Sequence, residues 1–179
     1  DKTLAMLKGA IDTLDIGNPE FLSTDIGPVI DIISKEKIIN HIKNFSKIFQ
    51  SKKVFTEGCF VPVTLIEISS LEEVKEEIFG PVVHIVSYKT REIKNLCEDI
   101  NKLGYGLTLG IHSRIDNTIN TIVESTNVGN IYINRNMVGA VVGVQPFGGH
   151  GKSGTGPKAG GPEYLKRLCN EYSVSNNIT

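Results

Sequence analysis

Two overlapping patterns near the end of the sequence could bind a phosphate group. Residues 149–154 satisfy G-x-G-x-x-G, and Gly151-Lys152-Ser153 resembles the end of a Walker A loop. Both patterns bind phosphate when a helix starts at the loop and points its N–H groups at the anion. Gly156-Pro157 follows and prevents such a start, and the Walker pattern needs glycine where this chain has Pro146. We therefore predict a shaped surface loop.

A cysteine nucleophile or a metal site is the other chemistry to consider. Cys97 and Cys169 fall on apolar faces of expected helices, where a free cysteine usually packs as a small hydrophobic residue. Cys59 follows Gly58 just before an expected strand and is slightly more suggestive of reactivity. No histidine has a cysteine or carboxylate at metal-ligand spacing; the histidines are His41, His84, His112 and His150. The residues alone predict no nucleophile and no metal ligand.

The elements that must position any site follow from the hydrophobic pattern. Apolar spacing predicts helices at 4–14, 34–49 with Ser34 as N-cap, 90–100, 116–123 and 163–170, and strands at 61–68, 82–88, 107–112 and 128–133. Strands that alternate with helices are typical of a parallel sheet flanked by helices, so we predict the α/β class. Residues 171–175 could add an edge strand.

A long glycine-rich loop follows the last of these strands. Residues 139–161 contain nine of the 18 glycines of the chain. Glycine gives the backbone access to positive φ, so regular structure is not expected there. A loop of this length in a compact domain is usually functional.

Composition limits the class of protein. The chain has 179 residues, of which 40% are hydrophobic and 22% charged, which is the balance of a globular domain. A net charge of -1 disfavours a nucleic-acid partner. No apolar run approaches the ~20 residues of a membrane helix, so no membrane span is expected. Three widely spaced cysteines and the lack of a signal-peptide pattern fit a cytoplasmic protein.

Three stretches carry a family resemblance. Residues 75–81 (KEEIFGP), 105–107 (YGL) and 134–149, in this order, resemble the C-terminal catalytic region of the NAD(P)-dependent aldehyde dehydrogenase superfamily. The runs 128–149 and 153–162 are similar to the L-glutamate γ-semialdehyde (pyrroline-5-carboxylate) dehydrogenase module of the bifunctional proline utilization A proteins. The resemblance covers nearly the whole chain and implies an aldehyde dehydrogenase catalytic-domain fold.

The resemblance also implies an activity and its partners. It implies oxidation of L-glutamate γ-semialdehyde to L-glutamate with NAD in proline catabolism. A cysteine thiolate would attack the aldehyde, hydride would leave to the nicotinamide, and water would hydrolyse the thioester. FAD would belong only to a fused proline dehydrogenase domain outside this chain. A homo-oligomer is expected, with residues 171–179 as the edge strand of an oligomerisation flap.

For the cofactor, the resemblance assigns two residues of the KEEIFGP segment. Glu77 would accept hydrogen bonds from the hydroxyls of the nicotinamide-side ribose, because one carboxylate can bind two vicinal hydroxyls. Phe79 would pack near the nicotinamide. The alternatives are a solvated charge at the end of an acidic helix for Glu77 and core packing for Phe79.

For the substrate, the resemblance assigns an anchor loop. The backbone N–H groups of Gly139 and Ala140 would hold the α-carboxylate, and Phe147 would line the aliphatic part of the substrate. Glycine suits such a position because no side chain blocks the approach of the anion. The alternative for this loop is a plain turn.

The sequence also departs from the family pattern. The Gly-Gln-x-Cys segment of the nucleophile, the general-base Glu, the oxyanion-hole Asn and the NAD domain do not occur in these residues, and Asp1 falls within an expected helix. We therefore expect residues 1–179 to be a partial catalytic domain, incomplete at its N-terminal side, inactive alone and dependent on the rest of a parent enzyme. The alternative is a non-catalytic interaction or regulatory remnant of a split gene. His150 and Lys152 differ from most members, which leaves their roles open.

Overall fold

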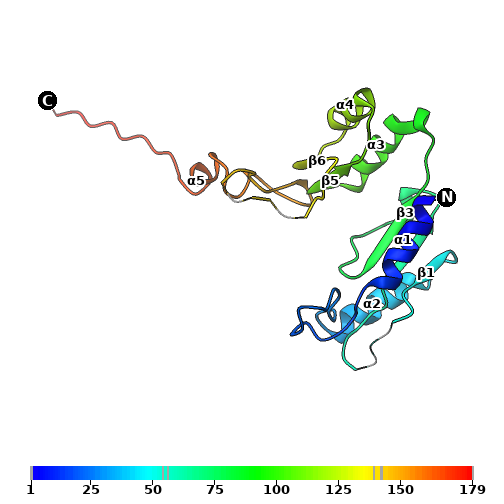
Figure 1. The fold of residues 1–179 in the computed structure, drawn as a ribbon. Helices are drawn as coiled ribbons and strands as arrows, with labels where there is room; N and C mark the ends of the chain where they lie inside the picture. Colours follow the sequence, from blue (N-terminus) through cyan, green and yellow to red (C-terminus); the bar gives the residue numbers. More distant parts are fainter. Residues whose placement is uncertain (1, 54, 56, 139, 142, 179) are drawn as a thin grey trace. The chain divides into compact units, whose positions relative to one another are not determined.

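The chain divides into two compact units, Asp1–Ser87 and Tyr88–Thr179 (Figure 1). The structure is a computed structural model that describes residues 2–53, 55, 57–138, 140–141 and 143–178. Within the described part, no helix has the length and apolarity that crossing a membrane requires.

A three-stranded sheet organises the first unit. Its central strand β2 (Thr64–Ile68) pairs antiparallel with β1 (Ile48–Gln50) and parallel with β3 (Val82–Val86). Helices α1 (Lys2–Thr13) and α2 (Ile32–Ile42) accompany the sheet, and a short 3-10 helix, η1 (Leu71–Glu73), precedes β3.

The alternation of side chains along β2 gives the first unit two cores. Leu65 packs with Ile11 of α1, whereas Ile66 packs with Ile38 and Ile42 of α2. Successive strand residues point to opposite faces of a sheet, so the two helices cover opposite faces of β2. Leu65 and Ile66 are 1% and 0% exposed, so this strand is buried on both sides.

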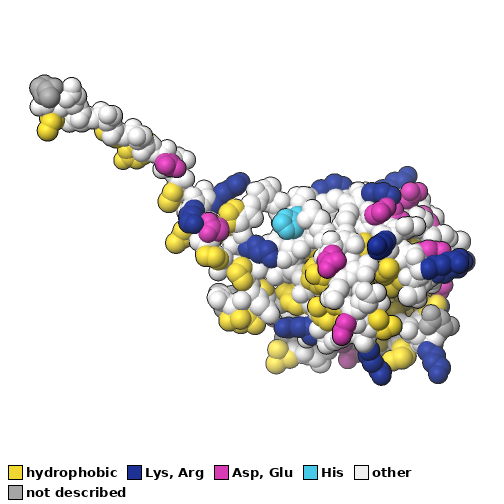
Figure 2. Space-filling view, turned by 90° about the horizontal axis from the view of Figure 1, so that it is seen from above, with side chains coloured by type: hydrophobic (Ala, Val, Ile, Leu, Met, Phe, Trp, Pro, Cys, Tyr) yellow, Lys and Arg dark blue, Asp and Glu magenta, His cyan; other side chains and the backbone are white. Residues whose placement is uncertain are grey.

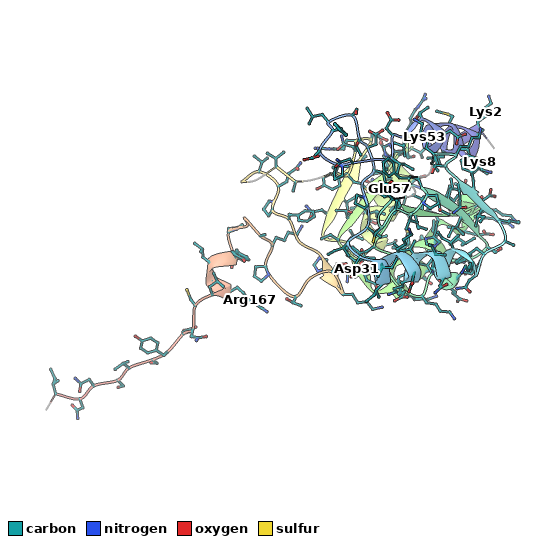
Figure 3. The ribbon with its side chains drawn as sticks, turned by 90° about the horizontal axis from the view of Figure 1, so that it is seen from below. Lys2, Lys8, Asp31, Lys53, Glu57 and Arg167 are labelled. Atoms are coloured by element: carbon teal, nitrogen blue, oxygen red, sulfur yellow. The ribbon has the colours of Figure 1, made fainter. Side chains whose placement is uncertain are left out.

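The start of α2 corrects one sequence prediction. Asp31, which is labelled in Figure 3, is the N-cap in place of Ser34. Its carboxylate accepts a hydrogen bond from the Ser34 backbone N–H at 2.7 Å. Ser34 therefore lies in the first turn. The bond from the Ser34 backbone holds the pKa of the Asp31 carboxyl below its ordinary value.

The end of α2 corrects a second prediction. The helix ends at Ile42, and Ile48 and Phe49 belong to β1, although their spacing from Ile42 suits a helix. Phe49 lies opposite Leu65 in the antiparallel ladder and packs in the same core. The sheet partner thus decides the conformation of this segment against its local pattern.

The second unit contains a parallel strand pair with two helices. Strands β5 (Thr108–Ile111) and β6 (Asn130–Ile133) pair in parallel. Helix α3 (Ile93–Leu103) follows the 3-10 helix η2 (Thr90–Glu92), and α4 (Asp116–Ser125) connects the two strands. The strand-helix-strand order from β5 through α4 to β6, like the parallel β2–β3 pair, confirms the predicted α/β class.

A small antiparallel ribbon closes the glycine-rich loop. Strand β4 (Tyr105–Gly106) pairs with β7 (His150–Gly151). Lys152 then donates its backbone N–H to Gly104 O at 2.8 Å and its ammonium to Leu103 O at 3.1 Å. These bonds satisfy carbonyls at the C-terminal end of α3, where a cation is favourable. Lys152 therefore has a structural role in helix capping.

The loop carries no helix at the G-x-G-x-x-G pattern. The next helix, α5 (Tyr164–Arg167), begins ten residues after Gly154 and has only four residues. The structure thus has a shaped loop at this pattern, but the expectation of no regular structure in residues 139–161 was wrong at His150–Gly151, which form β7 because they pair with β4.

The end of the chain differs from the predicted helix 163–170. Cys169 lies beyond α5 and is exposed, so its assignment to an apolar helix face was wrong. Residues 171–178 form neither helix nor strand, and their apolar side chains are exposed (Figure 2). An edge strand at a subunit interface needs a partner chain, so that prediction stays open.

Gly129 provides a test of how tightly the loop packs. A Cβ at this position would lie 1.8 Å from Gly148 O and 2.8 Å from Gly149 Cα. Both neighbours are backbone atoms that no rotamer change can move. We expect Gly129→Ala to lower the free energy of unfolding by about 2 kcal/mol or more, measured by urea denaturation.

Gly9→Ala is the matched control for this substitution. Gly9 lies within α1, and a Cβ there would meet no atom within 4 Å. Alanine favours a helix by up to ~1 kcal/mol over glycine, so this variant should be neutral or stabilised. A Gly129→Ala variant as stable as Gly9→Ala would contradict the close packing of the loop on β6.

Candidate functional site

Glu77 and Phe79 line one pocket of the first unit. The pocket has a volume of about 160 Å³ and is also lined by Ile78 and, from α2, by Ser34, Lys37 and Ile38. It lies between the helix and the segment that leads into β3. The structure thus brings together the two residues assigned to the cofactor.

Helix α2 and strand β2 hold the segment that carries these residues. Thr64 of β2 donates its backbone N–H to Pro81 O at 2.8 Å. Gly80 lies against α2 so closely that a Cβ on it would be 2.5 Å from Cδ1 of Ile38, a core residue that is 2% exposed. Ile78 packs against the same core. The pocket wall is therefore tied to the hydrophobic core.

The exposure of the two side chains bears on the alternatives. Phe79 is 81% exposed, so it does not pack in the core of the first unit. Glu77 is also exposed and lies beyond η1, which ends at Glu73, so it is not at the end of an acidic helix. An exposed carboxylate and an exposed aromatic ring at one pocket can bind a polar ring-bearing ligand.

Lys37 adds a positive charge to this pocket. Its ammonium lies 2.8 Å from a carboxylate oxygen of Glu76, and both side chains are more than half exposed. Such an exposed pair contributes little to stability, about 0 to 1 kcal/mol. Lys37 can therefore exchange Glu76 for another anionic partner at little cost in stability.

The predicted anchor loop belongs to the second unit. Ala140 and Phe147 are half-buried, and Gly139 lies outside the described residues. Between them the chain forms a turn in which Gln145 donates its backbone N–H to Val141 O at 2.8 Å, and its side-chain oxygen accepts the Val141 N–H at 3.2 Å. Ala140 and Phe147 thus lie on either side of one hydrogen-bonded turn.

The backbone of Phe147 is hydrogen-bonded to Ala159. Its N–H donates to Ala159 O at 3.0 Å and its carbonyl accepts the Ala159 N–H at 2.9 Å. This antiparallel bridge ties the loop to Ala159. Glu77 and Phe79 belong to the other unit, so the two pairs of residues are described separately.

Sequence reasoning missed Ser34 and Lys37 as pocket residues. Their spacing of three, with Ile38 next to Lys37, places them on one face of α2. That signal was present in the helical pattern. Its contact with residues 77–79 depends on the tertiary fold and could not be read from spacing.

A histidine pair of the first unit was also missed. The Nε2 atoms of His41 on α2 and His84 on β3 lie 2.8 Å apart, and the Phe45 ring contacts both rings. Burial lowers the pKa of both histidines. The His41 charge lowers the pKa of His84 further, while the Glu76 charge acts to raise the pKa of His41.

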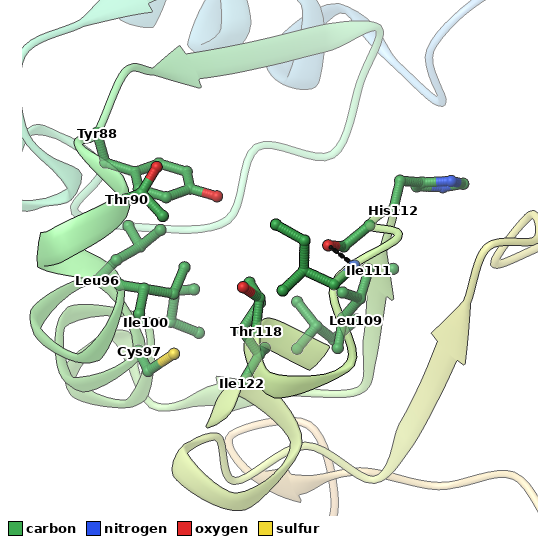
Figure 4. Close-up of a pocket in the computed structure, with 14 residues that line it drawn as sticks. Tyr88, Thr90, Leu96, Cys97, Ile100, Leu109, Ile111, His112, Thr118 and Ile122 are labelled. Carbon is green, nitrogen blue, oxygen red and sulfur yellow. Dashed lines mark hydrogen bonds between the residues drawn. The ribbon is translucent and has the colours of Figure 1, made fainter. Parts of the chain in front are cut away.

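The second unit also contains a larger cavity, of about 340 Å³, with mostly apolar walls from α3, α4 and β5 (Figure 4). Cys97 lies in its wall, and burial raises the pKa of this thiol. A raised pKa disfavours the thiolate that nucleophilic attack requires. Across the described ranges, no group of three or more His, Cys, Asp or Glu side chains could hold a metal ion.

Comparison with known proteins gives the following matches. The model of the aldehyde dehydrogenase family matches residues 1–174. The bifunctional protein PutA of Klebsiella aerogenes is 55% identical over 179 residues, covering 94% of this chain and 14% of that protein. The chain therefore spans about a seventh of the length of this relative.

Two solved structures extend the comparison. A mutant of Bradyrhizobium japonicum proline utilization A (PutA) superposes with a TM-score of 0.88 at 48% identity, covering 94% of this chain and 18% of that chain. A 1-pyrroline-5-carboxylate dehydrogenase from Thermus with bound NAD has a TM-score of 0.80 at 34% identity, covering 91% of this chain and 32% of that chain.

The histidine pair predicts a pH dependence of stability. Burial lowers the pKa of both rings below their ordinary value of 6.5, so the unfolded chain binds more protons than the folded chain in mildly acidic solution. Stability should therefore be full above about pH 6.5 and fall as the pH decreases below it. Denaturant unfolding from about pH 8 to pH 5 measures this slope.

Two variants assign the slope to these rings. His84→Phe should flatten the pH dependence, because it removes one titrating group and the charge that faces His41. The exposed His112 serves as the control, and His112→Phe should keep the original slope. Equal slopes in both variants would show that other groups cause the acid sensitivity.

Proposed function

This chain belongs to the aldehyde dehydrogenase family, and from that premise we propose that it forms part of the catalytic domain of an NAD-dependent enzyme of proline catabolism. The reaction is the oxidation of L-glutamate γ-semialdehyde to L-glutamate. The observation that carries the proposal is the pocket where Glu77 and Phe79 meet α2. The similarity to PutA and 1-pyrroline-5-carboxylate dehydrogenases supports the choice of substrate.

The residues at this pocket fit the nicotinamide end of NAD. The Glu77 carboxylate accepts hydrogen bonds from two vicinal ribose hydroxyls, and the exposed Phe79 ring offers a flat apolar surface to an aromatic ring. Lys37 supplies a cation at the same pocket. When bound, NAD accepts the hydride that leaves the substrate carbon. The role of Glu77 and Phe79 is to fix the orientation of the cofactor.

The loop of the second unit would hold the substrate. Backbone N–H groups of Gly139 and Ala140 bind the α-carboxylate, and Phe147 contacts the aliphatic chain. The hydrogen-bonded turn between Val141 and Gln145 and the bridge from Phe147 to Ala159 support this role, because they give the loop a defined shape. Backbone donors held in a fixed arrangement suit an anionic group.

The nucleophile would come from outside this chain. Burial raises the pKa of Cys97, and neither Cys59 nor the exposed Cys169 belongs to the two pockets described above. We propose that the chain acts together with the rest of a larger enzyme, is inactive alone, and associates with a second copy through residues 171–179. We expect the full-length enzyme to reduce NAD in the presence of L-glutamate γ-semialdehyde and residues 1–179 alone not to do so. Measurement of NADH formation by both proteins tests the proposed inactivity of the chain alone.

Glu77→Ala in the full-length enzyme tests the cofactor assignment. Loss of charge-assisted hydrogen bonds, each worth roughly 1.5 to 3 kcal/mol, should raise the KM for NAD or slow hydride transfer by about tenfold or more. Stopped-flow measurement of NADH formation reports both. Glu72→Ala, in the same acidic segment but outside the pocket, should leave both unchanged. Unchanged cofactor kinetics in Glu77→Ala would contradict the assignment.

Ala140→Phe tests the substrate assignment. The bulky side chain would intrude where the α-carboxylate binds, so kcat/KM for L-glutamate γ-semialdehyde should fall about tenfold or more. Propanal lacks the carboxylate and should be affected much less. Val144→Phe is the control, because Val144 is 74% exposed on the same loop. Equal losses for both aldehydes in Ala140→Phe would argue against an anchor at this position.

A further inference from the structure

We propose that Asn130 is a positioning residue that fixes the backbone of Phe147, and through it the selectivity of the enzyme for its aldehyde substrate. The proposal rests on the function proposed above, in which Phe147 contacts the substrate. Asn130 itself is placed in no contact with substrate or cofactor. It is the first residue of β6, and only 9% of it is exposed.

The side chain of Asn130 binds the backbone on both sides of Phe147. Its Nδ2 donates to Pro146 O at 3.1 Å, and its Oδ1 accepts the Gly148 N–H at 3.3 Å. Ala159 binds the remaining two groups, the N–H and the carbonyl of Phe147. The two peptide planes that meet at Phe147 therefore have all four polar groups hydrogen-bonded.

This arrangement fixes the direction in which the Phe147 side chain leaves the backbone. The two adjoining peptide planes define φ and ψ of a residue, and those angles set the direction of the Cα–Cβ bond. Ala159 holds one edge of each plane and Asn130 the other. Loss of the Asn130 bonds would leave each plane attached at a single edge.

An amide is the side chain that this position requires. One group must donate to a carbonyl and accept from an N–H at once, which asparagine does and aspartate or leucine does not. The ammonium of Lys158 donates to Gly129 O and lies 3.4 Å from Asn130 Oδ1, which favours an acceptor at that atom. Gly129, with no room for a Cβ, lets Gly148 approach β6 closely enough to reach the amide.

Asn130→Asp in the full-length enzyme tests the proposal. The substitution keeps the shape and the acceptor but removes the donor to Pro146 O. We expect kcat/KM for L-glutamate γ-semialdehyde to fall about tenfold relative to that for propanal, mainly through KM, with the KM for NAD unchanged. In this variant the carboxylate still accepts the Gly148 N–H, so hydrogen exchange at the Gly148 amide should stay slow, whereas Asn130→Ala loses this bond and should exchange faster. Asn130→Ala, which removes both bonds, should show the larger loss of selectivity. If the Ala variant fails to fold, the Asp variant decides the test.

Asn101→Asp is the matched control. The Asn101 side chain makes the same kind of backbone clamp elsewhere in the unit, donating to Ser125 O at 2.7 Å and accepting the Asn127 N–H at 2.8 Å. Its loss should leave the ratio between the two aldehydes unchanged. An unchanged ratio in Asn130→Asp, or an equal change in both variants, would overturn the positioning role.

The failure of the proposed function gives a different result. A wild-type enzyme that does not oxidise L-glutamate γ-semialdehyde would reject the proposed function, and with it the substrate-selective role of Asn130. The exchange rate of the Gly148 amide would then show separately whether Asn130 holds the loop. A wild-type enzyme that is active, with a variant that keeps its selectivity, would reject the role of Asn130 alone.

Discussion

The second unit depends on a direct backbone contact between Gly129 and Gly148. No side chain fits between them, because even a Cβ on Gly129 would overlap the carbonyl of Gly148. This contact brings the glycine-rich loop against the start of β6, where the Asn130 side chain accepts the Gly148 N–H and the Lys158 ammonium of the loop donates to Gly129 O. Close approach of main chains likewise explains Gly149, Gly151 and Gly154 of the loop, and phosphate binding is not needed to account for these glycines.

The first unit follows a different physical rule, which is burial of one strand on both faces. Leu65 and Ile66 are almost fully buried toward α1 and α2 respectively, so the position of α2 is set by the sheet. The same helix presents Ser34 and Lys37 to the pocket at residues 77–79. Hydrophobic packing and the candidate cofactor pocket therefore share one helix, and a change in how α2 packs would alter the pocket.

Local patterns predicted the α/β class and the strands around residues 64–68, 82–86, 108–111 and 130–133. They did not predict β1, because Ile48 and Phe49 continue the helical spacing of α2 and only their pairing with β2 makes them a strand. The N-cap was placed at Ser34 because serine suits that role, whereas the Asp31 carboxylate occupies it. Ser34, Lys37, Asn130 and the histidine pair were missed as site residues for one reason: their partners are distant in the sequence.

The contact between His41 and His84 has a consequence for how α2 is joined to β3. Two Nε2 atoms at 2.8 Å have room for a single hydrogen between them, so in the neutral pair one ring carries its hydrogen on Nε2 and the other on Nδ1. One added proton leaves this bond intact, with a cationic ring as donor. A second proton gives both rings a hydrogen on Nε2 and replaces attraction by repulsion. The helix and the strand are thus joined by a bond that is compatible with zero or one excess proton and incompatible with two.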